Sequence, residues 1–249
     1  MKLPGLRALD RKMLRELWRL RGQLISIGVV VATAVMTLVT MRGTYEALAG
    51  GRAEYYRDYR MADVWSSLER APETLRGRIA RIPGVAAVET RVASYATLDL
   101  PWLDAPGQGL FLSVPGTRRA GVNDVHIRHG RYVRPGRAGD TVVSETFFLA
   151  NDLALGDTIR AVLNGIRREL VVVGSAISPD QSYSVPPGAL YPEDERYGVF
   201  WVSRQVLGPN LDMDDAFNEV ALRMSPGASE VAVIRELDRL LDPYGGLGA

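Results

Sequence analysis

Residue types that could carry out chemistry are few in this 249-residue chain, and their spacing matches no standard catalytic motif. There is no cysteine, which excludes disulfides, thiolate nucleophiles and cysteine-ligated metals. The only lysines are Lys2 and Lys12. Neither follows the glycine-rich run that a Walker A site requires, so we expect no ATP hydrolysis by this chain.

The two histidines and the three clustered aspartates do not match the spacing of a metal site. His126 and His129 are separated by three positions, which places them on opposite faces of an extended chain. Asp212, Asp214 and Asp215 resemble the start of a calcium loop, but the required Gly and distal Glu are missing. We interpret the three aspartates as a helix-start cluster. G-x-S-x-G and S-x-x-K motifs are absent as well. The sequence predicts no catalytic residue, cofactor or metal, and it favours a binding or mechanical role over an enzyme.

The main positioning element is an apolar run near the N-terminus. The twenty residues between Arg21 and Arg42 carry no charge. As a helix they would be about 30 Å long, which matches the hydrocarbon core of a bilayer. We therefore predict a transmembrane helix over 22–41. Because basic residues precede it, the N-terminus is expected in the cytoplasm and the chain after residue 42 outside the membrane.

Two other interpretations of this apolar run are a buried helix and a signal peptide. A buried core helix of a soluble protein could be equally apolar, and Ala47-Leu48-Ala49 resembles a signal-peptide cleavage site. However, the run is long for a signal peptide, and Arg42 and Glu46 intervene before that site. We favour a retained membrane span.

Small and polar residues follow one side of the predicted span. Small residues let helices approach closely, and hydroxyls can bond to a neighbouring helix. The stripe predicts packing against other membrane helices. The stripe consists of Gly22, Ser26, Thr33, Thr37 and Thr40. Gly28 and Ala32 form a second pair of small residues on the same helix.

Residues 5–20 predict an amphipathic helix with a basic polar face. Such a helix suits the anionic cytoplasmic surface of a membrane. Docking on a soluble partner is the alternative. Nucleic-acid binding is not expected for residues held against a lipid bilayer.

The residues after the span predict an α+β domain. A helix continues over 43–61, a short strand covers 62–68, and Pro72 begins a helix over 72–82. One strand is expected over 88–98. A similar unit follows much later, with a strand over 217–224 and a helix whose inner face carries Val231, Ile234, Leu237 and Leu241. Two such units predict a split ferredoxin-like layer with an insertion between them.

The insertion, over about 100–215, is predicted to be rich in β-structure. Asn164-Gly165 joins two strands of a hairpin over 157–174 and is typical of a type I′ turn. Ser144 is a candidate N-cap of a short helix over 144–157. The proline-rich segment 178–196 is expected to be a loop whose Tyr183 and Tyr191 face a partner. A strand with Trp201 follows.

In this combination, the chain resembles the N-terminal part of the FtsX-like, or MacB-type, ABC transporter permeases. The segments that carry the resemblance are 62–92, 139–174 and 217–249. The resemblance implies a cytoplasmic amphipathic helix over 1–21 and a transmembrane helix over 22–41. It also implies a porter subdomain over 42–99 and 216–243, and an inserted β-rich Sabre-like subdomain over 100–215.

The resemblance also implies a function. Such a subunit lies in the bacterial inner membrane, with its external domain periplasmic or extracellular, and transmits the movement driven by a separate cytoplasmic ATPase. It implies a homo- or heterodimer of permeases and a periplasmic or outer-membrane partner. The family contacts its ATPase through further spans and a coupling loop, which do not occur within these residues. The alternative function is a single-span membrane sensor or interaction protein with an external ligand-binding domain.

Overall fold

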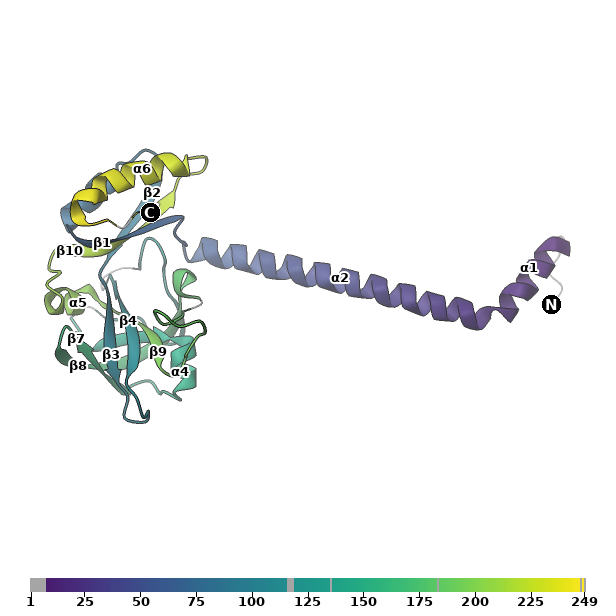
Figure 1. Ribbon diagram of the computed structural model, residues 1–249, viewed down its shortest axis with the longest axis horizontal. Coiled ribbons are helices and arrows are strands. Elements are labelled where there is room, and N and C mark those ends of the chain that lie inside the picture. Colours follow the sequence, from purple (N-terminus) through teal and green to yellow (C-terminus); the bar gives the residue numbers. More distant parts are fainter. Residues whose placement is uncertain (1–7, 116–118, 135, 183, 247, 249) are drawn as a thin grey trace. The chain divides into compact units, whose positions relative to one another are not determined.

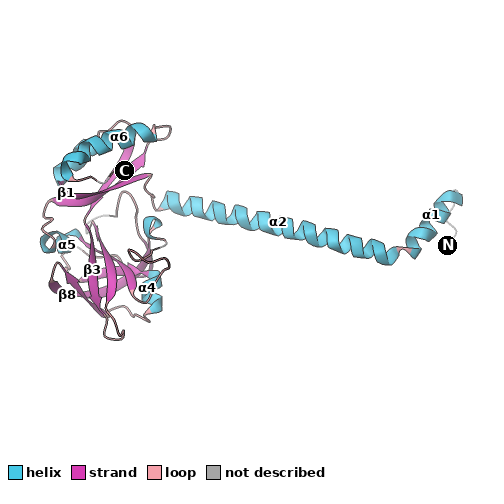
Figure 2. Ribbon diagram, in the orientation of Figure 1, coloured by secondary structure: helices cyan, strands magenta, loops and turns pink. Residues whose placement is uncertain are grey.

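The computed structural model describes residues 8–115, 119–134, 136–182, 184–246 and 248. It divides into two compact units, Met1–Glu54 and Tyr55–Ala249. The first unit is helical and the second is a mixed α+β domain (Figures 1 and 2). The α+β class is therefore confirmed, together with one apolar helix near the N-terminus.

Two helices begin the chain. The first, α1, spans Ala8–Arg19 and confirms the predicted amphipathic helix in its described part. The second, α2, spans Arg21–Asp58. No proline interrupts this segment, so its backbone hydrogen bonds can continue past the apolar run. The helix expected after residue 42 is thus an uninterrupted continuation of the helix that contains the apolar run.

A three-stranded sheet has the order β1-β10-β2, with antiparallel neighbours. These strands are β1 (Val64–Pro72), β10 (Ala216–Met224) and β2 (Val85–Arg91). Two segments from opposite ends of the sequence therefore form one sheet, as the two predicted units require. The strand predicted over 62–68 begins and ends later than expected.

The connection from β1 to β2 is shorter than predicted. A 3₁₀ turn, η1 (Glu73–Leu75), and a four-residue helix, α3 (Arg76–Ile79), replace the helix expected over 72–82. Pro72 still belongs to β1 and has an extended backbone. Gly77 lies inside α3 and is a weak helix former.

Helix α6 (Glu230–Leu241) lies across the three-stranded sheet (Figure 1). Ser229 caps it by accepting a hydrogen bond from the backbone N–H of Ala232. Its buried residues are Val233, Leu237 and Leu241, whereas Val231 is exposed. The prediction that Val231 belongs to the inner face is wrong, because the i, i+4, i+8 series starting at Val233 faces the sheet. A 3₁₀ turn, η3 (Asp242–Tyr244), follows.

The remaining strands form a seven-stranded sheet of order β5-β8-β6-β9-β4-β3-β7. An additional pairing of β7 with β8 closes the sheet on itself. This confirms the predicted β-rich region. Its strands are β3 (Ala93–Asp99), β4 (Gly107–Val114), β5 (His126–Gly130), β6 (Asp140–Ser144), β7 (Thr158–Leu163), β8 (Ile166–Ile177) and β9 (Tyr197–Ser203).

The single strand predicted over 88–98 is wrong. The chain forms β2 up to Arg91, passes through the fully buried Val92, and begins β3 at Ala93 in the other sheet. The alternating pattern continues across this crossing because both strands bury alternate residues, so the pattern cannot reveal the change of sheet. The change falls at Val92, before the subdomain boundary proposed at residue 99. The four subdomain ranges stay a prediction.

A cluster of phenylalanines fills the closed sheet. The rings of Phe111 and Phe200 are stacked, with 4.7 Å between their centroids. The ring of Phe147 packs edge-on against Phe200, with 5.3 Å between their centroids. Gly109 and Gly198 are register partners on β4 and β9 beside these rings. A Cβ at either glycine would come within 2.8 Å of a ring atom. The two glycines therefore make room for the aromatic core.

The predicted hairpin is confirmed. Asn164 and Gly165 have φ values of 48° and 75° between β7 and β8, as a type I′ turn requires. The capping prediction at Ser144 is only partly right. Ser144 precedes α4 (Glu145–Ala150), but its hydroxyl accepts from the backbone N–H of Val199 at 3.1 Å and makes no cap hydrogen bond. The neighbouring strand β9 supplies that donor.

A buried ion pair stabilises the closed sheet. The Asp140 carboxylate accepts from the Arg131 guanidinium at 2.6 Å and from the Arg134 backbone N–H at 3.2 Å. Burial alone would raise the pKa of Asp140, but these hydrogen bonds and the positive charge of Arg131 outweigh it and lower the pKa. The stabilisation is therefore present above the ordinary aspartate pKa and is lost as the pH falls through the lowered value.

We expect Asp140→Asn to lower the free energy of unfolding by about 1–3 kcal/mol at pH 7. The difference from wild type should shrink in acid, below about pH 4. Chemical unfolding of the detergent-solubilised chain across pH measures this. Glu169→Gln is the control, because its pair with Arg160 is exposed and should contribute less than about 0.5 kcal/mol. A pH-independent loss at Asp140 would contradict the assignment.

Candidate functional site

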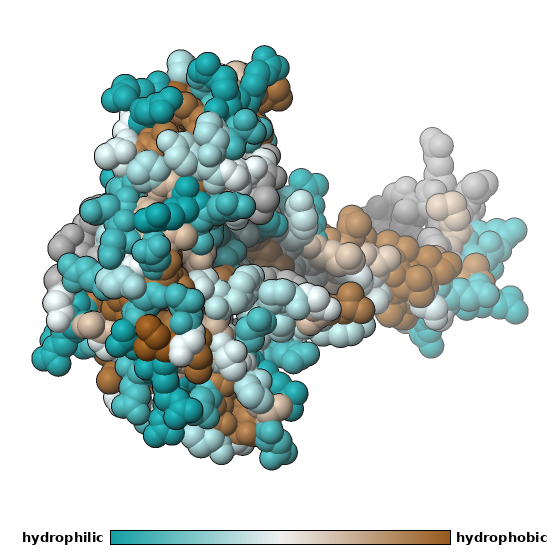
Figure 3. All heavy atoms as spheres, turned by 60° about the vertical axis from the view of Figure 1, so that its left-hand side comes forward, coloured by the Kyte–Doolittle hydropathy of each residue, from teal (hydrophilic) through white to brown (hydrophobic). Residues whose placement is uncertain are grey.

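The apolar run over 22–41 lies within α2, and α2 has no buried residue in the part of the chain that the structure describes. Figure 3 shows the apolar atoms of this helix on its surface. By length and composition α2 can cross a membrane, and it is the one helix among the described residues that meets this test. A helix with apolar side chains on all sides is suited to lipid rather than to water.

The small and polar stripe is arranged along one side of α2. The hydroxyls of Ser26, Thr33 and Thr37 donate to backbone oxygens one turn earlier, at 2.8–2.9 Å. Their protons are satisfied within the helix, so these hydroxyls can still accept a hydrogen bond from a neighbouring helix. A Cβ at Gly22 or Gly28 would meet no atom within 4 Å, so the surface is open at both glycines.

The structure brings part of the stripe together in a shallow apolar groove. Thr33, Thr37 and Thr40 line it together with methionine, tyrosine and leucine side chains. Ala32 is not among its lining residues, which agrees with a second, separate face containing Gly28 and Ala32. The packing role of all these residues remains a prediction.

We predict that Thr33→Leu combined with Thr37→Leu weakens association of α2 with its membrane partners by about threefold to tenfold. Each interhelical hydroxyl contributes about 0.6 kcal/mol, and the bulkier side chains also hold helices apart. Cross-linking in native membranes measures the association. Val31→Leu is the matched control, because Val31 lies on the opposite side of the helix. Equal losses in both variants would contradict a specific packing face.

Residues 59–63, which follow α2, are bonded into the α+β domain. The backbone N–H groups of Asn123 and Asp124 donate to the carbonyls of Arg60 and Tyr59, both at 2.9 Å. The Arg60 guanidinium pairs with the Asp124 carboxylate at 2.9 Å. The Tyr59 hydroxyl contacts Nδ1 of His126. No sequence pattern indicates this anchor, because its two halves are separated by about sixty positions.

A buried arginine joins the three-stranded sheet to the loop 178–196. Arg91, the last residue of β2, donates through Nε to Glu219 on β10 at 2.7 Å. Its Nη2 donates to Asp180 at 2.6 Å. Burial opposes the charged form of Arg91, but Asp180 and Glu219 outweigh it and raise the pKa of Arg91 above its ordinary value. Arg91 therefore stays charged at every physiological pH.

A second arginine ties the two sheets together elsewhere. Arg204 begins α5 (Arg204–Asn210), which follows strand β9 of the seven-stranded sheet. Its guanidinium pairs with Glu73 of η1 at 2.7 Å and donates to the carbonyl of Ala216 at 2.6 Å. These contacts fix the seven-stranded sheet to the edge of the three-stranded sheet where β1 ends and β10 begins.

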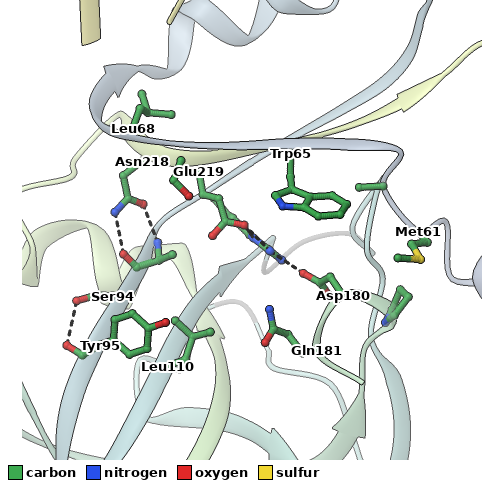
Figure 4. A pocket seen from close by; sticks show the side chains of 15 residues that line it. Met61, Trp65, Leu68, Ser94, Tyr95, Leu110, Asp180, Gln181, Asn218 and Glu219 are labelled. Carbon is green, nitrogen blue, oxygen red and sulfur yellow. Dashed lines mark hydrogen bonds and ion pairs between the residues drawn. The ribbon is translucent and has the colours of Figure 1, made fainter. Parts of the chain in front are cut away.

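A cavity of about 480 Å³ lies where the two sheets meet, and we name it the junction cavity. Its lining residues come from all three strands of the small sheet, from β3 and β4 of the large sheet, from residues 61–62 and from the start of the loop 178–196 (Figure 4). Asn218 borders it and bonds to both backbone groups of Ala93, at 2.7 and 2.8 Å. Sequence reasoning missed this site, because its residues are scattered from Met61 to Glu219.

The loop 178–196 is confirmed as irregular apart from one 3₁₀ turn, η2 (Pro179–Gln181). Its start is buried: Ser178 is fully buried, and its hydroxyl donates to Asp180. Its tip is exposed, with Leu190 at 85% and Tyr191 at 75%. Tyr183, the other predicted partner residue, lies outside the described residues. Removing the whole loop would therefore take away Asp180 and its pairing with Arg91.

We predict that Leu190→Ser with Tyr191→Ser changes the free energy of unfolding by less than about 0.5 kcal/mol. Asp180→Ala should cost about 1–3 kcal/mol, because it leaves Arg91 with one carboxylate. Thermal unfolding measures both free-energy changes.

Cross-linking in cells tests whether the loop tip faces a partner. A photo-reactive amino acid at position 191 should cross-link a partner protein, whereas the same amino acid at the exposed position 102 should not cross-link that protein. Identical cross-links at both positions would contradict a partner-facing tip.

The histidines and the aspartate cluster lie in separate surroundings. His126 contacts Tyr59, whereas Nε2 of His129 lies 3.3 Å from Glu145. Asp212, Asp214 and Asp215 lie in the turn between α5 and β10, so their interpretation as a helix start is wrong. Asp212 and Asp215 have positive φ, which short polar side chains tolerate in turns. No group of three metal-ligating side chains occurs among the described residues.

No family model and no curated protein matches this sequence. Solved structures resemble it at low sequence identity. One is the extracellular domain of a noncanonic ABC-type transporter, YknZ, from Gram-positive bacteria, with 12% identity, a TM-score of 0.47 and coverage of 77% of this chain and 96% of that one. Another is the periplasmic region of MacB from Actinobacillus actinomycetemcomitans, with 10% identity, a TM-score of 0.47 and coverage of 79% and 92%.

A third similar structure is a domain of a putative permease protein from Porphyromonas gingivalis. It has 14% identity and a TM-score of 0.40, and the match covers 72% of this chain and 78% of that one. The first two neighbours are thus an extracellular domain and a periplasmic region, and the third is a domain of a putative permease protein. Similarity at this level concerns the fold and not the activity.

Proposed function

We propose that this chain is the membrane subunit, or the N-terminal part of one, of an ABC transporter of the mechanotransmission type. In this function a separate cytoplasmic ATPase moves the membrane helices, and the external domain carries the movement outward. The permease resemblance of segments 62–92, 139–174 and 217–249 supports this assignment. In this proposal those segments form a split ferredoxin-like porter layer and a Sabre-like insertion.

One observation carries the mechanical part of the proposal. Helix α2 continues without a break from the apolar run to Asp58, and the residues from Tyr59 onward are bonded to Asn123, Asp124 and His126. An anchored helix end is what transmission of movement from a membrane span requires. The absence of a Walker A motif fits a subunit whose ATP hydrolysis is performed by a partner.

The proposal includes a location and an assembly. The N-terminus lies in the cytoplasm and the domain after residue 42 lies outside an inner membrane. The subunit pairs with a second permease through the stripe on α2, and the tip of loop 178–196 meets a periplasmic or outer-membrane partner. A single-span sensor with an external ligand-binding domain is the second candidate, and the junction cavity is the observation that favours it.

The proposal predicts a defined topology, which introduced cysteines can test because the natural chain has none. In intact cells, a thiol reagent that does not cross membranes should label Gly51→Cys fully. Lys12→Cys should react only after permeabilisation, because the basic segment stays inside. Labelling of both positions in intact cells would contradict a retained span.

The same cells separate the two candidate functions. The tagged protein, purified from its native membranes after cross-linking, should carry a subunit with a Walker A motif, identified by mass spectrometry. Gly51→Pro is the informative variant, because proline in a helix interior costs about 3 kcal/mol and breaks the continuity of α2. In this variant the ATPase subunit should still co-purify with the chain. A label attached to Ser94→Cys should no longer change its signal when ATP is added. Absence of an ATPase subunit would favour the sensor.

A further inference from the structure

The junction cavity has an aromatic wall on each side. Trp65 projects from β1 of the three-stranded sheet, and Tyr95 projects from β3 of the seven-stranded sheet (Figure 4). Both side chains border the cavity although each remains about half exposed, at 57% and 51%. Leu110, the register partner of Tyr95 on β4, extends the apolar surface. An exposed Trp and Tyr on one cavity offer two ring faces to a ligand.

The floor of the cavity carries an excess of negative charge. Among its lining residues, the only charged ones are Arg91, Asp180 and Glu219, so two carboxylates share one guanidinium. All three side chains are largely buried, with 11%, 13% and 16% of each exposed. Both oxygens of Asp180 are engaged, by Arg91 and by Ser178. Within the described residues, Oε2 of Glu219 has no hydrogen-bond partner, whereas Oε1 accepts from Arg91.

The strand register places Glu219 close to Trp65 on the same face of the sheet. Ser67 pairs with Glu219, and Arg91 pairs with Glu219 from the other side, so these residues form one row across the sheet. Trp65 lies two positions from Ser67 on the same face of β1. Trp65 and Glu219 are therefore diagonal neighbours, within reach of one small ligand.

We propose that the junction cavity binds an organic cation, with an ammonium or guanidinium head on an apolar body. The head bonds to Glu219 and lies against the indole of Trp65, since a cation is attracted to an aromatic face and to an unneutralised carboxylate. The body packs on Tyr95 and Leu110. A volume of about 480 Å³ lies within the usual range of small-molecule sites.

An occupant of this site contacts both sheets at once. Trp65 and Glu219 belong to the three-stranded sheet, while Tyr95 and Leu110 belong to the seven-stranded sheet. Binding therefore favours the arrangement in which the two sheets enclose the cavity. The site consists only of residues of the external domain, so it exists whether or not an ATPase joins the chain.

The experiment is calorimetric titration of the full chain in lipid nanodiscs with phenethylammonium. 2-Phenylethanol and 3-phenylpropionate are the neutral and anionic probes of similar shape. We expect the cation to bind at least tenfold more tightly than either. N-Acetyl-phenylalanyl-arginine amide tests whether a peptide guanidinium is preferred to a free amine. Tighter binding of either cationic probe supports the site and identifies the source of the charge.

Two variants test the assigned contacts. Trp65→Ala should weaken phenethylammonium binding by about fivefold to thirtyfold, because it removes the aromatic face. Trp102→Ala is the matched control, an exposed tryptophan (48%) that does not line the cavity, and it should change binding less than twofold. Glu219→Gln keeps the shape of the side chain and should remove the preference for the cation over 2-phenylethanol.

Folding of each variant is checked by its thermal unfolding midpoint before titration. Several results would overturn the site: no binding of a cationic probe to the wild-type chain, preference for the anion, or equal losses in Trp65→Ala and Trp102→Ala. Because these titrations need no ATPase, they can fail while the transporter proposal stands. Likewise, the cation can bind even if no ATPase subunit is found with the chain.

Discussion

The arrangement of the α+β domain depends on one buried positive charge. Arg91 ends a strand of the three-stranded sheet, and its guanidinium is shared by Glu219 of the adjacent strand and Asp180 of the loop 178–196. A buried charge that loses a partner costs several kcal/mol, so these three segments must stay together. The next residue, Val92, is fully buried, and the chain then enters the other sheet. The ion pairs thus hold the sheets together at the point where the chain passes between them.

Helix α2 obeys a different constraint. The hydroxyls of Ser26, Thr33 and Thr37 donate to carbonyls of the same helix, so their polar protons are satisfied internally, as a span in lipid would require. The far end of α2 leads into polar anchors on Asn123, Asp124 and His126. An apolar helix that ends in such an anchor can connect events in a membrane to an aqueous domain. This physical link underlies the transporter proposal.

Several arginines stabilise the packing of the α+β domain. Arg91, Arg131 and Arg204 each pair with carboxylates that are at least partly buried. The chain has 30 basic residues, of which all but two are arginine, and the planar guanidinium suits such bidentate contacts. At the junction cavity two carboxylates share one guanidinium, and Oε2 of Glu219 has no hydrogen-bond partner among the described residues.

Elements that depend on local composition can be predicted from residues adjacent in the chain. The charge-free run fixes α2 as a lipid-compatible helix, and Asn164-Gly165 fixes the hairpin, because both follow from residues adjacent in the chain. The α+β class and the pairing of the two terminal units follow from periodicity. The separation into a strand up to Arg91 and another from Ala93 could not be predicted, because alternation looks the same in one sheet or two.

The sites are formed by segments that are distant in the sequence and meet in the folded chain. The junction cavity unites residues from Trp65 to Glu219, and the anchor of α2 unites Tyr59 with His126. Likewise, Tyr191 and Asp180 belong to the same proline-rich loop, and Tyr191 is exposed whereas Asp180 is largely buried. The composition of the loop does not indicate which of its residues are buried. Their roles depend on burial and on contacts between distant segments, which arise only when the two sheets have packed.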